Sequence, residues 1–341
     1  MEYDKHNMLG MISSLPKQIS EMIDSMSTWK PTRKFGDMEN IVICGMGGSA
    51  IAGDLLCNIV KDDVSVPVYV VRDYHLPSWV GDKSMIILSS YSGNTEETLS
   101  CLEESLGKGA MSICVTTGGT LYEKSKELGL DCILMPSGYQ PRAALGYSLI
   151  SMLSILEYYA LIDSQFTLDN IGSNVNEIIS YGKELSDSNS SLSKELAEKV
   201  INKKIIIYGV QGITDVIAYR LRCQIAENSK ILCFHHTIPE MNHNEIEGWN
   251  KEQNSDDTVV IWFTDRDVHP RNKKRIEVTS DLLSKLGSKH EIISVVGGTR
   301  SVRLIKLIQL CDHISFDLAM LNEVDPTPVD RIVEMKVNLD K

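Results

Sequence analysis

The sequence GMGGSAIAGD, residues 45–54, follows the apolar run Ile41–Cys44 and continues into apolar residues at helical spacing. Glycines at the end of a β-branched run are typical of a tight turn from a strand into a helix, because glycine adopts backbone conformations that other residues avoid. The first turn of such a helix presents backbone N–H groups that bind phosphate. The stretch therefore predicts an α/β fold in which the first strand-to-helix turn holds an anion.

Short β-branched runs alternate with longer helical patterns in the first half of the chain. The predicted strands are Ile41–Cys44, Val66–Val71, Met85–Ser89, Met111–Thr116 and Cys132–Met135. A long apolar helical stretch follows, from Pro141 to Ala160. This alternation predicts a parallel sheet with helices on both faces.

The same pattern begins again in the second half of the chain. The strands predicted there are Ile205–Val210, Ile231–Phe234, Val259–Phe263 and Ile292–Val296, and a last helix is predicted near Val329–Val337. The segments IVICGMGGSAIAGDLL and IIIYGVQGITDVIAYRL share a strand, a glycine at its end, a second glycine and an apolar helix, which indicates an internal duplication. We expect an N-terminal domain over residues 1–160, a polar connection over 161–190 and a C-terminal domain over 191–341.

Composition limits the partners of this chain. Its 341 residues carry a formal net charge of -12, which argues against a surface for nucleic acid or an anionic membrane. The residues Met1–His6 lack the order of a secretory signal, and no apolar run approaches the ~20 residues of a membrane span. The eight cysteines form no C-x-x-C pair, which favours free thiols in a reducing compartment. We expect a cytoplasmic protein that binds a small molecule.

Two ligands remain open for the glycine turn, besides a purely structural turn. The residues 45–50 match the dinucleotide pattern G-x-G-x-x-[GA], and Asp73 ends the next strand, where a ribose-binding carboxylate would stand. A single phosphate is the other candidate. The turn by itself does not choose between them.

The stretch SSYSGNTEETL, residues 89–99, favours a single phosphate. It follows a predicted strand and opens a helix, so that Ser90, Ser92 and Thr95 would surround free N–H groups at the positive helix end. A simple N-cap by Asn94 or Thr95 is the alternative, but it accounts for only one residue of the loop. The matching place in the second half reads FTDRD and is acidic, so only the first half is expected to hold an anion.

Six blocks of the sequence, in order, resemble one enzyme family. ICGMGGSAIAGDLL, SYSGNTEET, PRAALGYSL, QIAENSK, HNEIEGW and VDPTPV resemble the bifunctional phosphoglucose/phosphomannose isomerases, which are built from two sugar-isomerase (SIS) domains. The resemblance extends from Gly45 to Lys336. It implies two α/β domains of SIS type, each a flavodoxin-like or Rossmann-like three-layer sandwich around a parallel five-stranded sheet.

The resemblance also implies an activity. The substrates would be glucose 6-phosphate and mannose 6-phosphate, isomerised reversibly to fructose 6-phosphate through a cis-enediol. No metal and no nicotinamide would be needed. The family implies a homodimer with its active sites at the subunit interface, in which the neighbouring subunit contributes the catalytic histidine.

Individual residues receive roles from the same resemblance. Those implied to line the active site on the first loop or to bind the phosphate are Gly47, Gly48, Ser49, Ser90, Ser92 and Thr95. Those implied to be catalytic are Glu227, His243, Lys336 and Arg142. Glu227 would carry a proton between C1 and C2, and His243 with Lys336 would open the sugar ring. Arg142 would stabilise the enediolate.

Structural roles are the alternatives for the catalytic residues. Glu227 ends an amphipathic helix, where pairing with Lys230 or Arg222 would suffice. A metal cluster would draw on His235, His236, His243, Glu240, Glu245 and Glu247, but their spacing does not match a known helical metal motif. Arg142 lies at a helix start, an unfavourable place for a cation, which itself hints at a function.

Two residues depart from the family pattern. Ser229 stands where many relatives have alanine, and Glu247 stands where an apolar residue is common. A carboxylate from Glu247 close to His243 would favour the charged imidazolium. Thr327, in the DPTP segment, is linked by the resemblance to the region that admits either C2 epimer.

Two other functions remain open. A sugar-phosphate sensor would need only the phosphate loops, whereas this chain also retains Glu227, His243, Arg142 and Lys336. A dinucleotide-dependent oxidoreductase would need Asp73 and would leave the hydroxyl loop unexplained. Binding of a hexose 6-phosphate without nucleotide would separate these functions.

Overall fold

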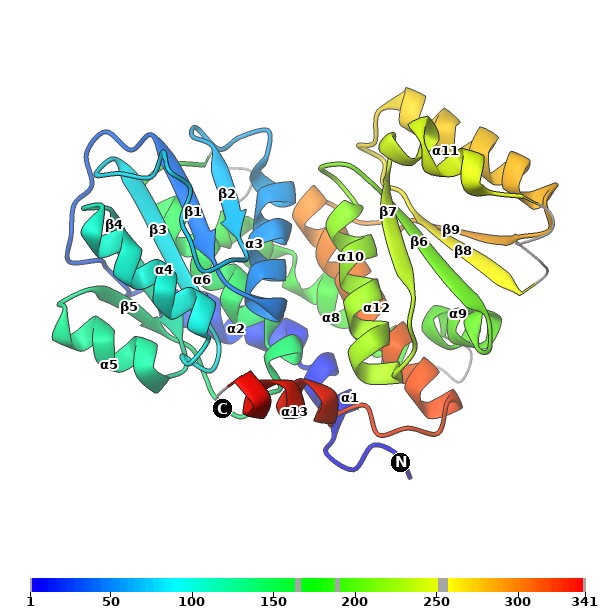
Figure 1. The fold of residues 1–341 in the computed structure, drawn as a ribbon, viewed down its shortest axis with the longest axis horizontal. Helices are drawn as coiled ribbons and strands as arrows, with labels where there is room; N and C mark the ends of the chain where they lie inside the picture. Colours follow the sequence, from blue (N-terminus) through cyan, green and yellow to red (C-terminus); the bar gives the residue numbers. More distant parts are fainter. Residues whose placement is uncertain (1, 163–166, 188–190, 251–256, 340–341) are drawn as a thin grey trace. The chain divides into compact units, whose positions relative to one another are not determined.

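The computed structural model describes residues 2–162, 167–187, 191–250 and 257–339. Contacts divide the chain into two compact units (Figure 1). The N-terminal unit comprises Ser14–Ile179 with Gly297–Val302, and the C-terminal unit comprises Met1–Ser13, Ser180–Val296 and Arg303–Lys341. The domain boundaries at residues 160 and 190 stay a prediction. Within the described residues, no helix is both long enough and apolar enough to cross a membrane.

The N-terminal unit is built on a parallel sheet of five strands, as predicted. Its strands are β1 (Asn40–Cys44), β2 (Val68–Val71), β3 (Ser84–Ser90), β4 (Met111–Thr116) and β5 (Asp131–Leu134), in the order β2-β1-β3-β4-β5. Strands β3 and β4 are buried along their whole length, because helices cover both faces of the sheet. The predicted runs correspond to these five strands within two residues at either end.

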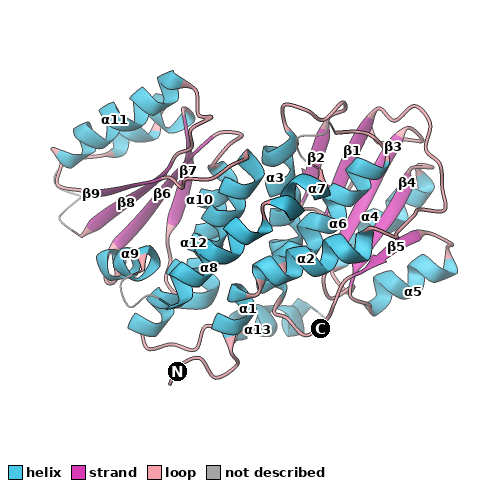
Figure 2. Cartoon of the chain, turned by 180° about the vertical axis from the view of Figure 1, so that it is seen from behind, coloured by secondary structure: helices cyan, strands magenta, loops and turns pink. Residues whose placement is uncertain are grey.

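Helices form the outer layers of the N-terminal unit (Figure 1, Figure 2). They are α2 (Leu15–Met26), α3 (Gly47–Val60), α4 (Glu96–Gly107), α5 (Gly119–Glu127), α6 (Leu145–Tyr158) and α7 (Leu168–Ser173). Helices α4 and α5 pack on one face, where Leu102 and Leu121 join Ile86 in a single apolar cluster. Helices α3 and α6 pack together on the other face, where α3 lies against Ile43.

The C-terminal unit has a parallel sheet of four strands among the described residues, as many as the predicted runs but one fewer than the family resemblance implies. They are β6 (Lys204–Val210), β7 (Phe234–Ile238), β8 (Thr258–Phe263) and β9 (Lys289–Ile293), in the order β7-β6-β8-β9. The prediction of a fifth strand is wrong because the chain enters the long helix α12 (Arg300–Leu321) soon after β9. The two strands at the edges of this sheet, β7 and β9, also begin and end at other residues than predicted.

The edge strands carry weak sequence signals. Ile231–Phe234 was predicted, but the strand begins at Phe234, which pairs with Ile206 of β6. The reason is that the side chains of β7 are mostly half-exposed, so its sequence FHHTI lacks an apolar pattern. Strand β9 likewise lies three residues before the predicted position, on the other edge.

Helices also cover the second sheet. The unit contains α1 (Met8–Ser13), α9 (Leu192–Val200), α10 (Asp215–Gln224), α11 (Pro270–Ser284) and α13 (Asp330–Leu339), and helix α8 (Val175–Asp187) lies in the predicted connection. Helix α11 packs on one face, where Ile276 and Leu283 join Trp262 in an apolar cluster. Helices α10 and α12 are joined by an ion pair between Arg220 and Asp312. Every residue of α13 whose side chain is described is exposed.

Candidate active site

The glycine turn lies where the first strand ends in the N-terminal unit. Strand β1 pairs directly with β3, so the loops after both strands meet at the carboxyl edge of the sheet. A Cβ atom on Gly45 would come within 2.9 Å of the carbonyl oxygen of Ser89, which explains why the turn requires glycine. Helix α3 then starts at Gly47, and Ser49 is buried in its first turn.

The hydroxyl loop after β3 forms a compact turn beside the glycine turn. The hydroxyl oxygens of Ser90 and Thr95 lie 2.8 Å apart. The backbone N–H of Gly93 donates to Ser90 Oγ at 3.1 Å, and that of Asn94 donates to Ser92 Oγ at 3.2 Å. Ser90 is buried, whereas Ser92 is exposed at the loop surface.

The side chains of this loop do not form the simple N-cap that was the alternative to phosphate binding. Thr95 precedes helix α4 but makes no side-chain capping bond to it. The side-chain oxygen of Asn94 instead accepts hydrogen bonds from the backbone N–H and the hydroxyl of Thr120, both at 3.0 Å. Since neither side chain caps α4, the first turn of this helix remains a suitable place for an anion.

Arg142 lies in the same unit and against the same helix α3. It occupies the 3₁₀ turn η1 (Pro141–Ala143) and is only 4% exposed. A Cβ atom on Gly48 would come within 2.8 Å of the carbonyl oxygen of Pro141, so η1 packs directly on the first turn of α3. The structure thus brings Arg142 to Gly48, which the sequence alone could not show.

Two buried side chains hold the turn around Arg142. The amide of Gln18, on α2, donates to the carbonyl of Ala143 at 2.7 Å and accepts from the N–H of Gly146 at 3.1 Å. The hydroxyl of Tyr91 donates to the carbonyl of Pro136 at 2.9 Å and accepts from the N–H of Tyr139 at 3.2 Å. These two residues were not predicted, because their partners are distant in the sequence.

Asp73, the residue required by the dinucleotide alternative, takes part in a local turn. It follows β2 and is exposed. Its carboxylate accepts a hydrogen bond from the backbone N–H of the next residue, Tyr74, at 2.7 Å. This local role accounts for the aspartate without a ribose.

Glu227 lies in the C-terminal unit, on a π-helical turn. Helix α10 ends at Gln224 and the chain continues as a π-helical turn over Ile225–Ser229. Single π-helical turns are frequent at functional sites. Lys230 then ends the turn with a left-handed backbone, at φ 61°.

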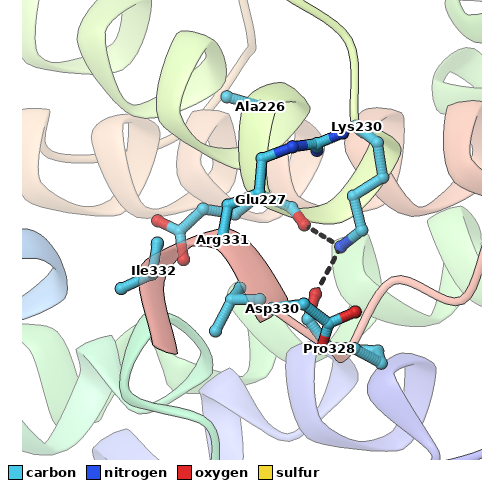
Figure 3. A pocket seen from close by; sticks show the side chains of 8 residues that line it. Ala226, Glu227, Lys230, Pro328, Asp330, Arg331 and Ile332 are labelled. Atoms are coloured by element: carbon cyan, nitrogen blue, oxygen red, sulfur yellow. Dashed lines mark hydrogen bonds between the residues drawn. The ribbon is translucent and has the colours of Figure 1, made fainter. Parts of the chain in front are cut away.

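A pocket of about 520 Å³ opens beside this turn. Its lining residues are Ala226, Glu227, Lys230, Pro328, Val329, Asp330, Arg331 and Ile332. Figure 3 shows Glu227 and Lys230 on one side and the first residues of α13 on the other. The family block VDPTPV leads into this second wall, but Asp330 and Arg331 lie just beyond it and were not predicted.

Buried polar groups fix the π-helical turn against α12. The side-chain amide of Asn228 donates to Ser315 Oγ at 2.9 Å, and Ser229 Oγ donates to the carbonyl of Ser315 at 2.7 Å. The side-chain amide of Asn322 donates to the carbonyl of Ser229 at 2.9 Å. The hydroxyl of Ser229 therefore makes a structural hydrogen bond to α12.

His243 and Lys336 lie apart from the lining of this pocket. His243 ends the 3₁₀ turn η4 (Glu240–His243) and is exposed, and Glu247 in the turn η5 (Glu245–Gly248) is exposed as well. Lys336 lies on α13 and is exposed. The effect of Glu247 on His243 stays a prediction.

Among the histidines and glutamates of this region, His236 and Glu245 form an ion pair. His236 Nδ1 lies 3.0 Å from one carboxylate oxygen of Glu245, and the other oxygen of that carboxylate accepts a hydrogen bond from the Tyr208 hydroxyl. Burial is the main reason why the pKa of Tyr208 is strongly raised, so this hydroxyl stays protonated and donates. Within the described residues, no group of three or more potential ligands could hold a metal ion.

Comparisons with known proteins agree with the arrangement. Residues 189–339 match the family described as the bacterial phospho-glucose isomerase C-terminal SIS domain. A bifunctional phosphoglucose/phosphomannose isomerase from Caldicellulosiruptor bescii is 39% identical over 340 residues, covering 97% of this chain and 98% of the relative. Another, from Aquifex aeolicus, is 34% identical and covers 89% of this chain and 91% of the relative.

The fold is shared with more distant structures. The C-terminal domain of glucosamine-fructose-6-phosphate aminotransferase from Francisella tularensis superposes with a TM-score of 0.75 at 16% identity, covering 95% of this chain and 98% of that one. This likeness concerns the fold alone. With relatives at 39% and 34% identity over most of its length, the chain belongs to the family of bifunctional phosphoglucose/phosphomannose isomerases.

Proposed function

We propose that this chain reversibly isomerises glucose 6-phosphate and mannose 6-phosphate to fructose 6-phosphate. The observation that carries the proposal is the meeting of the glycine turn, the hydroxyl loop and Arg142 at one sheet edge. Two helix N-termini and a cluster of hydroxyls suit a compact dianion, and an arginine on the turn that packs against α3 suits a second negative charge. A sugar phosphate that forms an enediolate carries both of these negative groups.

The substrate's phosphate is placed on the hydroxyl loop. Ser90, Ser92 and Thr95 would contact its oxygens, next to the positive end of α4. Gly47, Gly48 and Ser49 would line the site, because the glycines allow close approach to the backbone. Fixing the phosphate in this way would orient the carbons that react.

The proton transfer is assigned to Glu227. Its carboxylate lies in a pocket large enough for a small ligand and is half-buried, which suits a general base. It would take the proton from C2 of the aldose and deliver it to C1 through a cis-enediol. Arg142 would stabilise the charge that develops on the enediolate oxygens, and His243 with Lys336 would open the ring beforehand.

A homodimer is part of the same proposal. The side chain of His243 is exposed and does not line the pocket around Glu227. A second copy of the chain would supply this histidine, as the family resemblance implies. The mass of the purified protein in solution, measured by light scattering, tests the dimer.

The activity is tested with purified protein in the absence of added metal and nucleotide. Glucose 6-phosphate and mannose 6-phosphate serve as separate substrates, and fructose 6-phosphate is measured as the product. We expect both to turn over, and Glu227→Gln to reduce kcat by about 10³-fold or more, because the amide cannot accept the proton. The control is Glu195→Gln, which removes an exposed carboxylate on α9 that pairs with Lys199.

Each outcome of this assay separates the candidate functions. Turnover of glucose 6-phosphate alone would remove mannose 6-phosphate from the proposal. Binding of a hexose 6-phosphate without any turnover would indicate a sensor. A Glu227→Gln variant as active as the Glu195→Gln control would show that Glu227 is not the base.

A further inference from the structure

Lys230 joins the two walls of the pocket that contains Glu227. Its ammonium group donates hydrogen bonds to three backbone carbonyls, those of Glu227, Pro326 and Pro328. The bond to Pro328 is 2.7 Å long and that to Pro326 is 3.3 Å. One carbonyl belongs to the π-helical turn, and the other two belong to the segment that leads into α13. Figure 3 shows the bonds to Glu227 and Pro328.

The backbone of Lys230 indicates that the side chain has a specific task. Its φ of 61° lies in the left-handed region, where glycine is the usual residue at the end of a helix. A residue with a side chain occupies this region at a steric cost, which persists where the surrounding contacts determine it. The three carbonyl contacts of the ammonium group provide those contacts.

Lysine suits these carbonyls better than arginine does. The ammonium group carries three donors that radiate from one atom, so it can serve three converging acceptors. A guanidinium presents its donors in a flat fork that matches carboxylates and phosphates. The ammonium group has no acceptor, so it can only donate to these carbonyls.

We propose that Lys230 is a positioning residue that sets the distance between Glu227 and the opposite wall of the pocket at Pro328–Ile332. The residue would act through Glu227 and would not touch the reacting carbons. This inference rests on the proposed role of Glu227 as the base. Small displacements of a catalytic group reduce the rate of chemistry strongly, whereas binding of a distant phosphate does not depend on them.

The test uses two variants of the full chain. Lys230→Met keeps the apolar stem of the side chain and removes the donors. Lys230→Gly also removes the donors but adopts the left-handed backbone without strain, so it remains informative if Lys230→Met folds poorly. The matched control is Lys306→Met, which removes another ammonium group that donates to a backbone carbonyl, that of Val296, away from the pocket lining.

We expect a loss of kcat without a loss of binding. In both Lys230 variants kcat should fall about 10- to 100-fold, as expected for a displaced base. The Kd for a hexitol 6-phosphate, which has no carbonyl to isomerise, should stay within about twofold, because phosphate contacts dominate its binding. With substrate deuterated at C2, the isotope effect on kcat should increase, since proton transfer becomes slower.

The outcomes decide between positioning and simple structural support. A Lys230→Gly variant with unchanged kcat, whatever its melting temperature, would overturn the inference. A weaker Kd with unchanged kcat would overturn it as well, since Lys230 would then contact the substrate. An active Glu227→Gln variant would reject the proposed role of Glu227 as the base. An inactive Glu227→Gln variant together with two fully active Lys230 variants would reject only the inference about Lys230.

Discussion

At the scale of single residues, Tyr91 connects two parts of the candidate site. It belongs to the hydroxyl loop, yet its own hydroxyl is directed to Pro136 and Tyr139, in the segment that leads to Arg142. The side chain is 8% exposed. The phenol group of Tyr91 therefore joins the hydroxyl loop to the segment that leads into the turn of Arg142.

Tyr91→Phe should lower the activity by displacing Arg142. We expect kcat to fall about tenfold, with a loss of stability of about 1 kcal/mol for the buried hydroxyl. Combined with Arg142→Lys, the effect on kcat should be less than additive, because both changes disturb the same guanidinium. A double-mutant cycle on kcat measures this coupling.

The control for this cycle is Tyr159→Phe. The Tyr159 hydroxyl also donates to a backbone carbonyl, that of Arg33, at 2.9 Å. This variant should lose similar stability but keep kcat, and it should add independently to Arg142→Lys. Full additivity of Tyr91→Phe with Arg142→Lys would show that Tyr91 does not act through the arginine.

The sequence locates the candidate loops better than the side chains that support them. The hydroxyl loop follows β3 as predicted, because its glycine and hydroxyls come directly after an apolar run. The hydrogen bonds of Gln18 and Tyr91 span more than a hundred and more than forty residues respectively, so no local pattern contains them. Packing, which brings distant residues together, is what the sequence leaves open.

At the scale of elements, helix α12 carries two buried titratable groups with opposite effects on stability. His313 and Asp317 are four residues apart, so they share one face of the helix. Burial raises the pKa of Asp317 to about 6, although Ser193 donates to its carboxylate at 2.6 Å. Burial, aided by Lys194, lowers the pKa of His313 to about 4.

The signs of the two contributions follow from linkage. Asp317 binds its proton more tightly in the folded state, so its contribution to the free energy of unfolding falls as pH rises from about 4 to about 6. His313 binds its proton less tightly when folded, so its contribution rises between about pH 4 and about 6.5. In the wild type the two contributions oppose each other over the same range.

Asp317→Asn should therefore expose the contribution of His313. Relative to wild type, the free energy of unfolding should increase by about 2 kcal/mol near pH 7 and should change little near pH 4. His313→Gln should show the reverse pH dependence: relative to wild type, the free energy of unfolding should increase near pH 4 and should change little near pH 7. Urea unfolding at several pH values measures both differences, and parallel curves for Asp317→Asn and wild type would contradict the prediction.

Edge strands show where prediction of elements from the sequence fails. The buried strands β3, β4 and β8 are apolar runs, and each was predicted correctly because burial on both faces demands such a run. The strands β7 (FHHTI) and β9 (KHEII) lie at sheet edges, and neither has a continuous apolar run or a regular alternation of polar and apolar residues. Their pairing with a neighbouring strand determines where they begin, and the sequence contains no direct signal for it.

At the scale of the whole molecule, the loops that follow the strands of the two sheets differ in charge. In the C-terminal unit a carboxylate already binds the turn after β6, because Asp215 accepts a hydrogen bond from the backbone N–H of Gly212 at 2.9 Å. In the loop after β8, the buried guanidinium of Arg303 binds both carboxylate oxygens of Asp265 and one of Asp267. Internal carboxylates thus occupy the places where the N-terminal unit has glycines and hydroxyls.

This difference predicts one sugar-phosphate site per chain despite the duplication. Titration calorimetry with a hexitol 6-phosphate should give one site per chain, since the acidic loop of the second sheet repels a dianion. The double variant Ser90→Ala/Ser92→Ala should abolish this binding. Thr264→Ala, which removes the hydroxyl at the matching place after β8, should leave both Kd and stoichiometry unchanged.

The alternative is a second sheet that kept its ability to bind phosphate after the duplication. It would give two sites per chain, or one site that survives Ser90→Ala/Ser92→Ala and is lost in Thr264→Ala. The acidic loop argues against it on physical grounds, because Asp265 and Asp267 already neutralise the guanidinium that an incoming phosphate would need. Both sheets are parallel, but hydroxyls follow β3 and carboxylates follow β8, so we expect a single place for the anion.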